Sequence, residues 1–261
     1  MCLYTITCIH FLHFLQVRTL VDRGIEAVAL VRSVDSITDN TLRYLKGAKI
    51  IECNVLDEES VSQAYSSLPK KPSSTICCLA SRSGLKDESY LVDYGGGLNV
   101  FNCQRKAAED EAFSHFVLLS AFCVGKPLLQ FQFAKIKLET AIRDITLNSL
   151  EEKKGIISHS IIRPTAFFKS LDGQVESVQN GAPCLYFGNG ECAANAIAER
   201  DLANYLIDCA IKPKDMDMMN TARDIGGPDV PPITKKQQIN LIYETLGVEP
   251  SKRTAFSIPV G

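Results

Sequence analysis

Five short apolar runs, separated by segments with helical spacing, limit what this chain can fold into more than any other feature. The runs are nearly continuous rather than alternating, which is typical of strands buried on both faces of a parallel sheet. They cover residues 26–32, 48–54, 74–80, 115–121 and 158–164. Strands that alternate with helices predict right-handed β-α-β units. The chain is therefore expected to form a doubly wound α/β sheet.

The intervening segments carry helix signals. Asp57 is a good N-cap, and the two glutamates that follow it suit the positive end of a helix. Apolar residues between Val61 and Leu68 then recur at helical spacing. Longer helices are expected over residues 91–113 and 127–148.

The last hundred residues follow a different pattern. They contain a short-turn signal at residues 189–190, a helical stretch over residues 200–211 and a capping box that begins at Thr234. Two domains are expected, a larger sheet domain over residues 1–170 and a smaller mixed region over residues 171–261. The smaller region would cover the carboxyl ends of the strands, where open α/β sheets bind ligands.

Composition and charge exclude several classes of function. The chain has 28 Lys and Arg against 30 Asp and Glu, and no basic run exceeds a pair, so no nucleic-acid partner is expected. The ten cysteines are scattered, with neither Cys-x-x-Cys nor zinc spacing. This pattern favours reduced, buried thiols and no metal site.

The first seventeen residues contain no Lys, Arg, Asp or Glu. This stretch is shorter than the ~20 residues that a transmembrane helix needs, and two histidines interrupt it. It has neither the basic region nor the cleavage site of a secretory signal. It resembles the inside of a folded domain, so no transmembrane segment is expected.

Sheets of this class that hold a dinucleotide usually begin with a strand, a glycine-rich loop and a helix. Here the first glycine is Gly24, and residues 17–23 before it are typical of the last turns of a helix. Glycines 95–97 and 226–227 are interpreted as turns or breaks. The first strand and the glycine loop of a Rossmann-like domain are therefore expected to be missing or replaced by residues 1–17.

Two later motifs carry a first resemblance. Ser120 closes a predicted strand, and Phe131 and Lys135 lie four residues apart on the next helix, on one helical face. This arrangement is similar to the short-chain dehydrogenases and reductases, whose active sites use a Ser and a Tyr-x-x-x-Lys pair. In that family the lysine holds the nicotinamide ribose and lowers the pKa of the tyrosine.

A closer resemblance rests on seven segments that agree in order and spacing. They are residues 78–82, 115–121, 126–135, 162–171, 173–175, 226–228 and 258–261. Together they resemble the NADPH-dependent divinyl chlorophyllide a 8-vinyl reductases, in the extended, atypical, NmrA-like branch. The resemblance implies reduction of the 8-vinyl group of a tetrapyrrole, divinyl chlorophyllide or protochlorophyllide, in chlorophyll biosynthesis in the chloroplast. It also implies a chain shortened at both ends, is compatible with peripheral membrane contact, and leaves the oligomeric state open.

The resemblance implies a set of cofactor-binding residues: Arg32, Asn54, Leu79, Ala80, Ser81, Lys135 and Pro164. Arg32 would meet the ribose 2′-phosphate and select NADPH, since a guanidinium pairs bidentately with phosphate. Asn54 would hold the adenine. Ordinary roles stay open for all of them, including a solvated arginine, an exposed helix lysine, a turn asparagine, loop packing and a strand-ending proline.

The resemblance also implies catalytic roles for Lys135, Ser120 and Tyr94. Tyr94 is the candidate proton donor, because Phe131 stands where short-chain dehydrogenases and reductases usually have their tyrosine and has no proton to give. This Phe resembles what the vinyl-reductase branch carries. Packing in a helix is the alternative for Tyr94. Substrate-binding residues are expected to be Arg163, Thr165, Phe167 and Phe168.

Two alternatives to the reductase stay open. One is a non-catalytic NADP-binding sensor or scaffold of the NmrA-like branch, which need not keep the substrate-side residues 167–169 and 173–175. The other is an inactive fragment, because loss of a central strand would expose unpaired strand edges and remove the pyrophosphate site.

Overall fold

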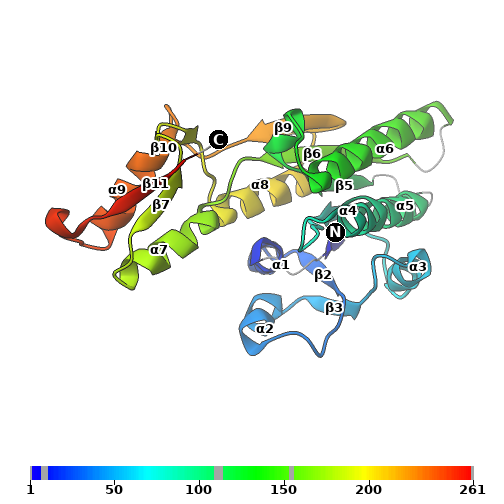
Figure 1. Ribbon diagram of the computed structural model, residues 1–261. Helices are drawn as coiled ribbons and strands as arrows, with labels where there is room; N and C mark the ends of the chain where they lie inside the picture. The colour runs from blue at the N-terminus through cyan, green and yellow to red at the C-terminus, as the bar shows by residue number, and fades with distance from the viewer. Residues whose placement is uncertain (1, 7–10, 109–113, 153–155, 260–261) are drawn as a thin grey trace. The chain divides into compact units, whose positions relative to one another are not determined.

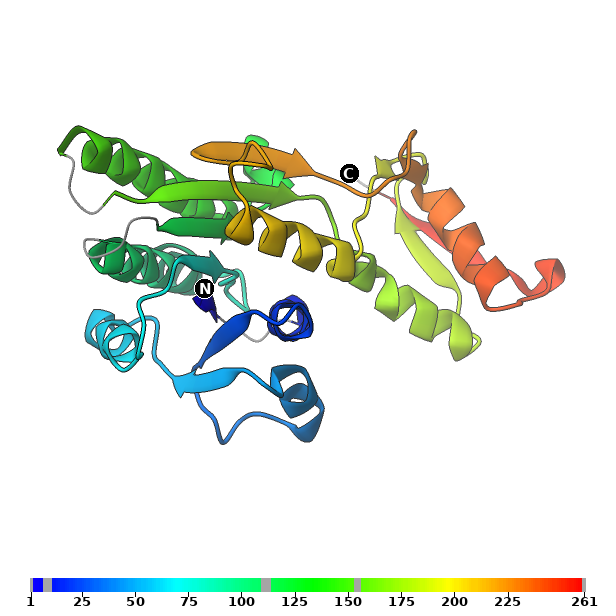
Figure 2. The same ribbon diagram turned by 180° about the vertical axis from the view of Figure 1, so that it is seen from behind.

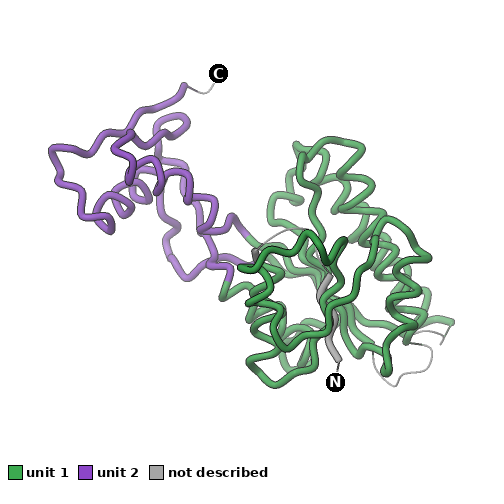
Figure 3. Tube along the Cα trace, turned by 90° about the horizontal axis from the view of Figure 1, so that it is seen from below, with its two compact units in different colours: residues 1–164, 200–224 green, residues 165–199, 225–261 purple. Residues whose placement is uncertain are grey.

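The computed structural model describes residues 2–6, 11–108, 114–152 and 156–259. The chain divides into two compact units (Figure 3). Unit 1 consists of Met1–Pro164 and Arg200–Asp224, and unit 2 of Thr165–Glu199 and Ile225–Gly261.

Unit 1 is built on a seven-stranded sheet (Figure 1). In spatial order its strands are β3 (Lys49–Glu52), β2 (Glu26–Val31), β1 (Cys2–Ile6), β4 (Ser74–Cys77), β5 (His115–Leu119), β6 (Ser158–Pro164) and β9 (Thr221–Ile225). Every strand pair from β3 to β6 is parallel. The predicted doubly wound α/β sheet is confirmed, and most of its strands end two or three residues earlier than the apolar runs do.

The first strand is present, so the expectation that it is missing was wrong, and the alternative of a replaced strand holds. β1 lies at the centre of the sheet, where Leu3 is in register with Ala27 on one side and Ser74 on the other. Its five residues are uncharged and rich in strand-forming types, and they cover the edges that β2 and β4 would otherwise leave unpaired. The glycine loop is absent from the sequence, and residues 7–10, which follow β1, lie outside the described residues.

Helices cover both faces of the sheet (Figures 1 and 2). The helices of unit 1 are α1 (Phe11–Asp22), α2 (Asp39–Leu45), α3 (Glu58–Ser66), α4 (Lys86–Ser89), the π-helical η1 (Tyr90–Gly96), α5 (Gly97–Ala107), the 3₁₀ turn η3 (Phe122–Gly125), α6 (Gln130–Glu152) and α8 (Glu199–Ile211). On the α3, α5 and α6 side, the rings of Phe101 and Phe116 meet edge to face within the main core. On the opposite side, Arg23 after α1 pairs with Asp208 of α8 at 2.7 Å.

Glycines 95–97 do not form a break, which corrects the sequence interpretation. They lie inside a continuous helical run, as the last residues of η1 and the first of α5. A Cβ atom at Gly97 would lie 2.4 Å from Cδ2 of Leu138 on α6. The glycine is therefore explained by the close approach of α5 to α6 rather than by a turn.

Unit 2 is a smaller mixed unit. Its elements are η4 (Phe168–Leu171), α7 (Asp172–Gln179), β7 (Cys184–Phe187), β8 (Ala193–Ala194), β10 (Ile233–Thr234), α9 (Lys235–Thr245), η5 (Pro250–Lys252) and β11 (Ala255–Ile258). The predicted capping box is confirmed, with Thr234 and Gln237 exchanging side-chain to backbone hydrogen bonds. β7 pairs in parallel with β11, and β8 antiparallel with β10.

The sequence analysis expected one domain boundary, after residue 170, but the chain passes between the two units more than once. Residues Arg200–Asp224 return to unit 1 because α8 buries Leu202 and Leu206, and β9 completes the large sheet. Among the helices of the described residues, none has an apolar stretch sufficient to span a lipid bilayer. The same residues contain no cluster of His, Cys, Asp and Glu that could hold a metal ion.

Candidate active site

Lys135 is buried in α6 and reaches the carboxyl ends of two neighbouring strands. Its side chain is 8% exposed, and its ammonium lies 3.2 Å from Oδ1 of Asp93. The ammonium also donates to the carbonyl oxygens of Leu79, at 3.1 Å, and Leu119, at 3.4 Å. The ammonium thus has two hydrogen-bond acceptors, and Oδ1 of Asp93 contributes opposite charge without a hydrogen bond of its own to another described residue. The alternative of an ordinary exposed helix lysine was wrong.

Asp93, which the sequence analysis did not single out, holds this lysine from the π-helical turn. Its side chain is 1% exposed, and its Oδ2 accepts a hydrogen bond of 3.1 Å from the backbone N–H of Ser81. π-helical turns are rare and recur at functional sites. Asp93 thus connects Lys135 with the turn that follows β4, where Ser81 was predicted to contact a cofactor.

Glu139, one helical turn beyond Lys135 on α6, is the centre of a second cluster of polar side chains. Its carboxylate, 2% exposed, accepts hydrogen bonds from Oγ of Ser120 at 2.6 Å and from Nε of Arg163 at 3.0 Å. The other carboxylate oxygen of Glu139 accepts a hydrogen bond from Nη2 of Arg163. It accepts another from Nη2 of Arg143, at 3.3 Å. The hydrogen bond with Glu139 raises the pKa of Arg163, so its guanidinium stays charged.

The two groups are adjacent. Lys135 and Glu139 are four residues apart on α6, and their partners Leu119 and Ser120 are consecutive at the end of β5. Because Ser120 gives its hydrogen to Glu139, its oxygen offers lone pairs rather than a proton. The site therefore presents fixed charges and acceptors at the carboxyl edge of β4 to β6.

The other residues that were predicted to bind the cofactor also belong to unit 1 but are not part of these two clusters. Arg32 is exposed directly after β2, and no ion pair with another described residue engages it. Oδ1 of Asn54 accepts from the backbone N–H of Leu56 at 3.2 Å, which is the turn role left open for it. Ala80 is half-buried in the turn after β4, and Pro164 is the buried last residue of β6.

Tyr94 follows Asp93 in the π-helical turn and is half-buried. The ammonium of Lys137, on α6, lies 4.3 Å from the centre of its ring, a cation–π contact. Phe131 is half-buried on α6, one turn before Lys135.

The predicted substrate residues are divided between the units, with Arg163 in unit 1 and the others in unit 2. Thr165 donates through its hydroxyl to the carbonyl of Asn195, and Phe167 forms a β-bridge with Ile197. The ring of Phe168 lines an apolar cavity of unit 2.

A buried polar group on α1 also escaped the sequence analysis. The amide of Gln16 donates to Sγ of Cys78, just past β4, at 3.1 Å, and burial raises the pKa of that thiol to about 12. His13, on the same helix, is fully buried, and neither of its ring nitrogens has a hydrogen-bond partner among the described residues. Nothing in the sequence around these residues marks them as buried together.

Comparisons with known proteins identify a family for this chain. Residues 15–213 match the model of a family described as NAD(P)H-binding. The chain is similar to the chloroplastic divinyl chlorophyllide a 8-vinyl-reductase of Cucumis sativus, with 37% identity over 94% of this chain and 56% of that protein. The enzyme of the same name from Arabidopsis thaliana is 36% identical over 90% of this chain and 55% of its own length. The chain thus spans about half the length of these relatives.

Solved structures share the fold at low identity. The UDP-glucose 4-epimerase of Thermotoga maritima superposes with a TM-score of 0.79 and 16% identity, over 100% of this chain and 86% of that one. The UDP-glucose 4-epimerase of Thermus thermophilus, solved with NAD, gives 0.75 and 15%, over 99% and 86%.

Proposed function

The chain belongs to the NAD(P)H-binding family, and from this premise we propose that it uses NADPH to reduce the 8-vinyl group of divinyl chlorophyllide or protochlorophyllide to ethyl. Four relatives at 36–38% identity are named for that reaction, which supports the proposal. Those relatives are also named chloroplastic, and we propose the chloroplast as the location of this protein.

The observation that carries the proposal is the buried Asp93–Lys135 pair. Open α/β sheets bind ligands at the carboxyl ends of their strands, where the strand order reverses. In this sheet the reversal lies between β1 and β4, and Lys135 binds the carbonyl of Leu79 just past β4. A buried charge pair costs desolvation energy, so its position at this edge favours a functional role.

The residues present fit the two ends of NADPH. Arg32 would hold the 2′-phosphate, because it is exposed and makes no ion pair within the described residues. Lys135 would hold the nicotinamide ribose by exchanging one of its carbonyl partners, of which Leu119 is the more distant at 3.4 Å. Residues 7–10, which follow β1 in the sequence and lie outside the described residues, are Thr-Cys-Ile-His and contain no glycine.

The bound cofactor would supply a hydride to the vinyl carbon, and a proton is then needed on the neighbouring carbon to complete the ethyl group. Phe131 cannot supply that proton. Tyr94 is the proposed donor, with water as the alternative. Ser120 and Arg163, both fixed by Glu139, would orient the pigment, so catalysis would depend mainly on positioning.

The test measures binding and turnover on the same chain. Calorimetry with NADPH and with NADH gives the affinities, and chromatography of pigment incubated with NADPH detects the ethyl product. We expect Lys135→Met to weaken NADPH binding at least tenfold, and Lys71→Met, an exposed lysine before the amino end of β4, to leave it within twofold. Replacement of Arg32 by Gln should remove the preference for NADPH over NADH.

Each other outcome has a defined meaning. Binding of NADPH without any ethyl product would favour the non-catalytic sensor. Absence of NADPH binding in this chain and in one with a glycine loop restored would contradict the reductase. Unchanged turnover in Tyr94→Phe would discard Tyr94 as the proton donor.

A further inference from the structure

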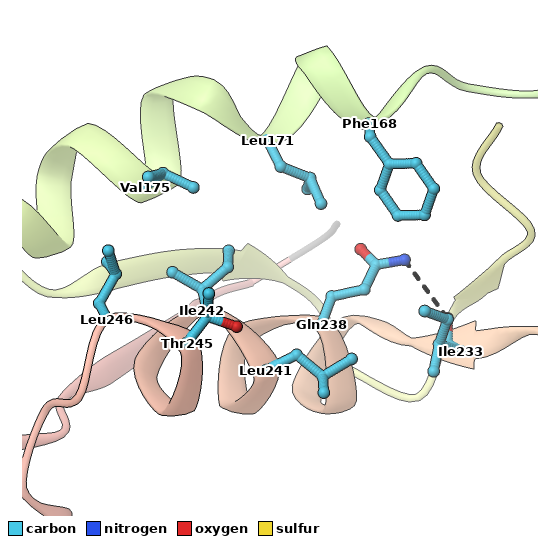
Figure 4. Close-up of a pocket in the computed structure, with 9 residues that line it drawn as sticks. All are labelled: Phe168, Leu171, Val175, Ile233, Gln238, Leu241, Ile242, Thr245 and Leu246. Atoms are coloured by element: carbon cyan, nitrogen blue, oxygen red, sulfur yellow. Dashed lines mark hydrogen bonds between the residues drawn. The ribbon is translucent and has the colours of Figure 1, made fainter. Parts of the chain in front are cut away.

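Unit 2 contains a cavity of about 250 Å³, and among the predicted site residues only Phe168 lines it (Figure 4). Phe168, Leu171 and Val175 of η4 and α7 face residues of α9 across it. Its lining is completed by Ile233, Gln238, Leu241, Ile242, Thr245 and Leu246. All of these residues belong to unit 2, so the cavity is a property of that unit alone.

The lining is apolar and carries no charge. Its one amide, Gln238, is already engaged, because it accepts from the ammonium of Lys235 at 2.9 Å and donates to the carbonyl of Ile233. Thr245 contributes the only hydroxyl of the lining. A ligand part that enters the cavity must therefore be apolar, since a buried polar group without a partner is costly.

Two large apolar side chains at the cavity stay in contact with solvent. Phe168 is 37% exposed and Leu241 is 48% exposed. Other apolar residues of the lining, Ile242 among them, pack on the core of unit 2. The exposed ring of Phe168 offers a flat apolar surface to a planar ligand.

Volume limits what the cavity can take. A cavity of roughly 150 Å³ binds benzene in a well-studied protein, and drug-sized ligands need about 300–1,000 Å³. At about 250 Å³, this cavity suits one or two small rings with their alkyl groups but not a whole macrocycle.

We propose that this cavity holds an apolar edge of the tetrapyrrole, with the carboxylate of the pigment left in solvent. This inference rests on the proposed function for the identity of the ligand. It does not depend on NADPH or on turnover, because every residue that lines the cavity belongs to unit 2.

The test titrates the chain with divinyl protochlorophyllide in the absence of NADPH and follows pigment fluorescence. We expect Leu241→Glu to raise the Kd at least tenfold, because a carboxylate would be placed at the edge of the cavity. The matched control is Leu185→Glu on β7, a leucine of unit 2 with the same exposure, 48%, outside the lining. Its Kd should stay within twofold of the parent.

A second variant separates shape from charge. Val175→Phe keeps the lining apolar and fills part of the cavity, so it should also raise the Kd at least tenfold while thermal unfolding shows a folded chain. Pigment binding that survives both substitutions would overturn the inference, as would a parent chain that binds a straight-chain fatty acid but no pigment.

The outcomes also separate this inference from the proposed function. If the parent binds pigment through Leu241 but forms no ethyl product, the cavity inference stands and the reductase fails. If the parent forms product and Leu241→Glu binds pigment normally, the reverse holds.

Discussion

Acidification from pH 7 to pH 5 is expected to destabilise unit 1 strongly, because three histidines are buried there without charge. His13, His115 and His159 are each at most 3% exposed. Burial lowers the pKa of His13 and of His115 to about 3, and that of His159 to about 4. His115 binds the hydroxyls of Ser158 and Ser160, which can serve a neutral ring as donor and acceptor.

The sign and size of the effect follow from proton linkage. In the unfolded chain these histidines have a pKa near 6.5, so between that pH and the folded value the unfolded state binds more protons. Their contribution is present above pH 6.5 and is lost as the pH falls. Between pH 7 and pH 5 each histidine should cost about 2 kcal/mol, and the three together about 6 kcal/mol. That is a large part of the ~5–15 kcal/mol that stabilises a typical domain.

The assay is urea unfolding followed by far-UV circular dichroism at pH 8, 7, 6 and 5, with the free energy of unfolding extrapolated to water. These histidines should change stability by less than about 0.5 kcal/mol between pH 8 and pH 7, which serves as the internal control. Replacement of His115 by Gln should reduce the loss between pH 7 and pH 5 by about 2 kcal/mol. An identical loss in parent and variant would refute the reasoning, whatever the variant does to stability at pH 7.

Three further predictions concern packing and pairing. Gly97→Ala should destabilise unit 1 by about 1–3 kcal/mol, because the new methyl group would overlap Leu138; urea unfolding measures it. Asp93→Asn should cost about 3–5 kcal/mol in the same assay, since it leaves the buried ammonium of Lys135 without its counter-charge. Thr234→Ala should cost unit 2 about 1 kcal/mol through loss of the N-cap of α9, and Thr234→Ser should restore it; unchanged unfolding in the alanine variant would contradict the capping role.

The sheet could be predicted because a strand buried on both faces must be apolar at nearly every position. β1 satisfies that rule and was nevertheless misread. β1 has the required residue types, but the expectation was tied to the glycine loop, and a chain without the loop was interpreted as a chain without the strand. Whether a segment pairs as a strand depends on its own residue types. Whether the loop after it is rich in glycine depends on the ligand that the loop must bind.

Glycines 95–97 show where prediction from local sequence fails. A glycine triplet predicts a break when only local conformation is considered. What decides here is a contact with Leu138, which is distant in sequence and belongs to another helix. The return of Arg200–Asp224 to unit 1 is equally non-local, because the buried face of α8 is visible in the sequence but the surface that covers it is not.

Part of the candidate site could be predicted from the sequence, because three of its positions lie on one face of α6. Positions 131, 135 and 139 follow one another at steps of four, so they share the face on which Lys135 was predicted. A carboxylate on a buried face needs a partner, because an unpaired buried charge costs several kcal/mol. Glu139 therefore predicts a cation nearby, and Arg163 was already placed at the end of the adjacent strand. Extending the four-residue step by one turn therefore predicts from the sequence that Glu139 lies near Ser120 and Arg163. Asp93 could not be predicted in this way. It lies in a π-helical turn, and the spacing of residues in such a turn differs from the regular period of an α-helix.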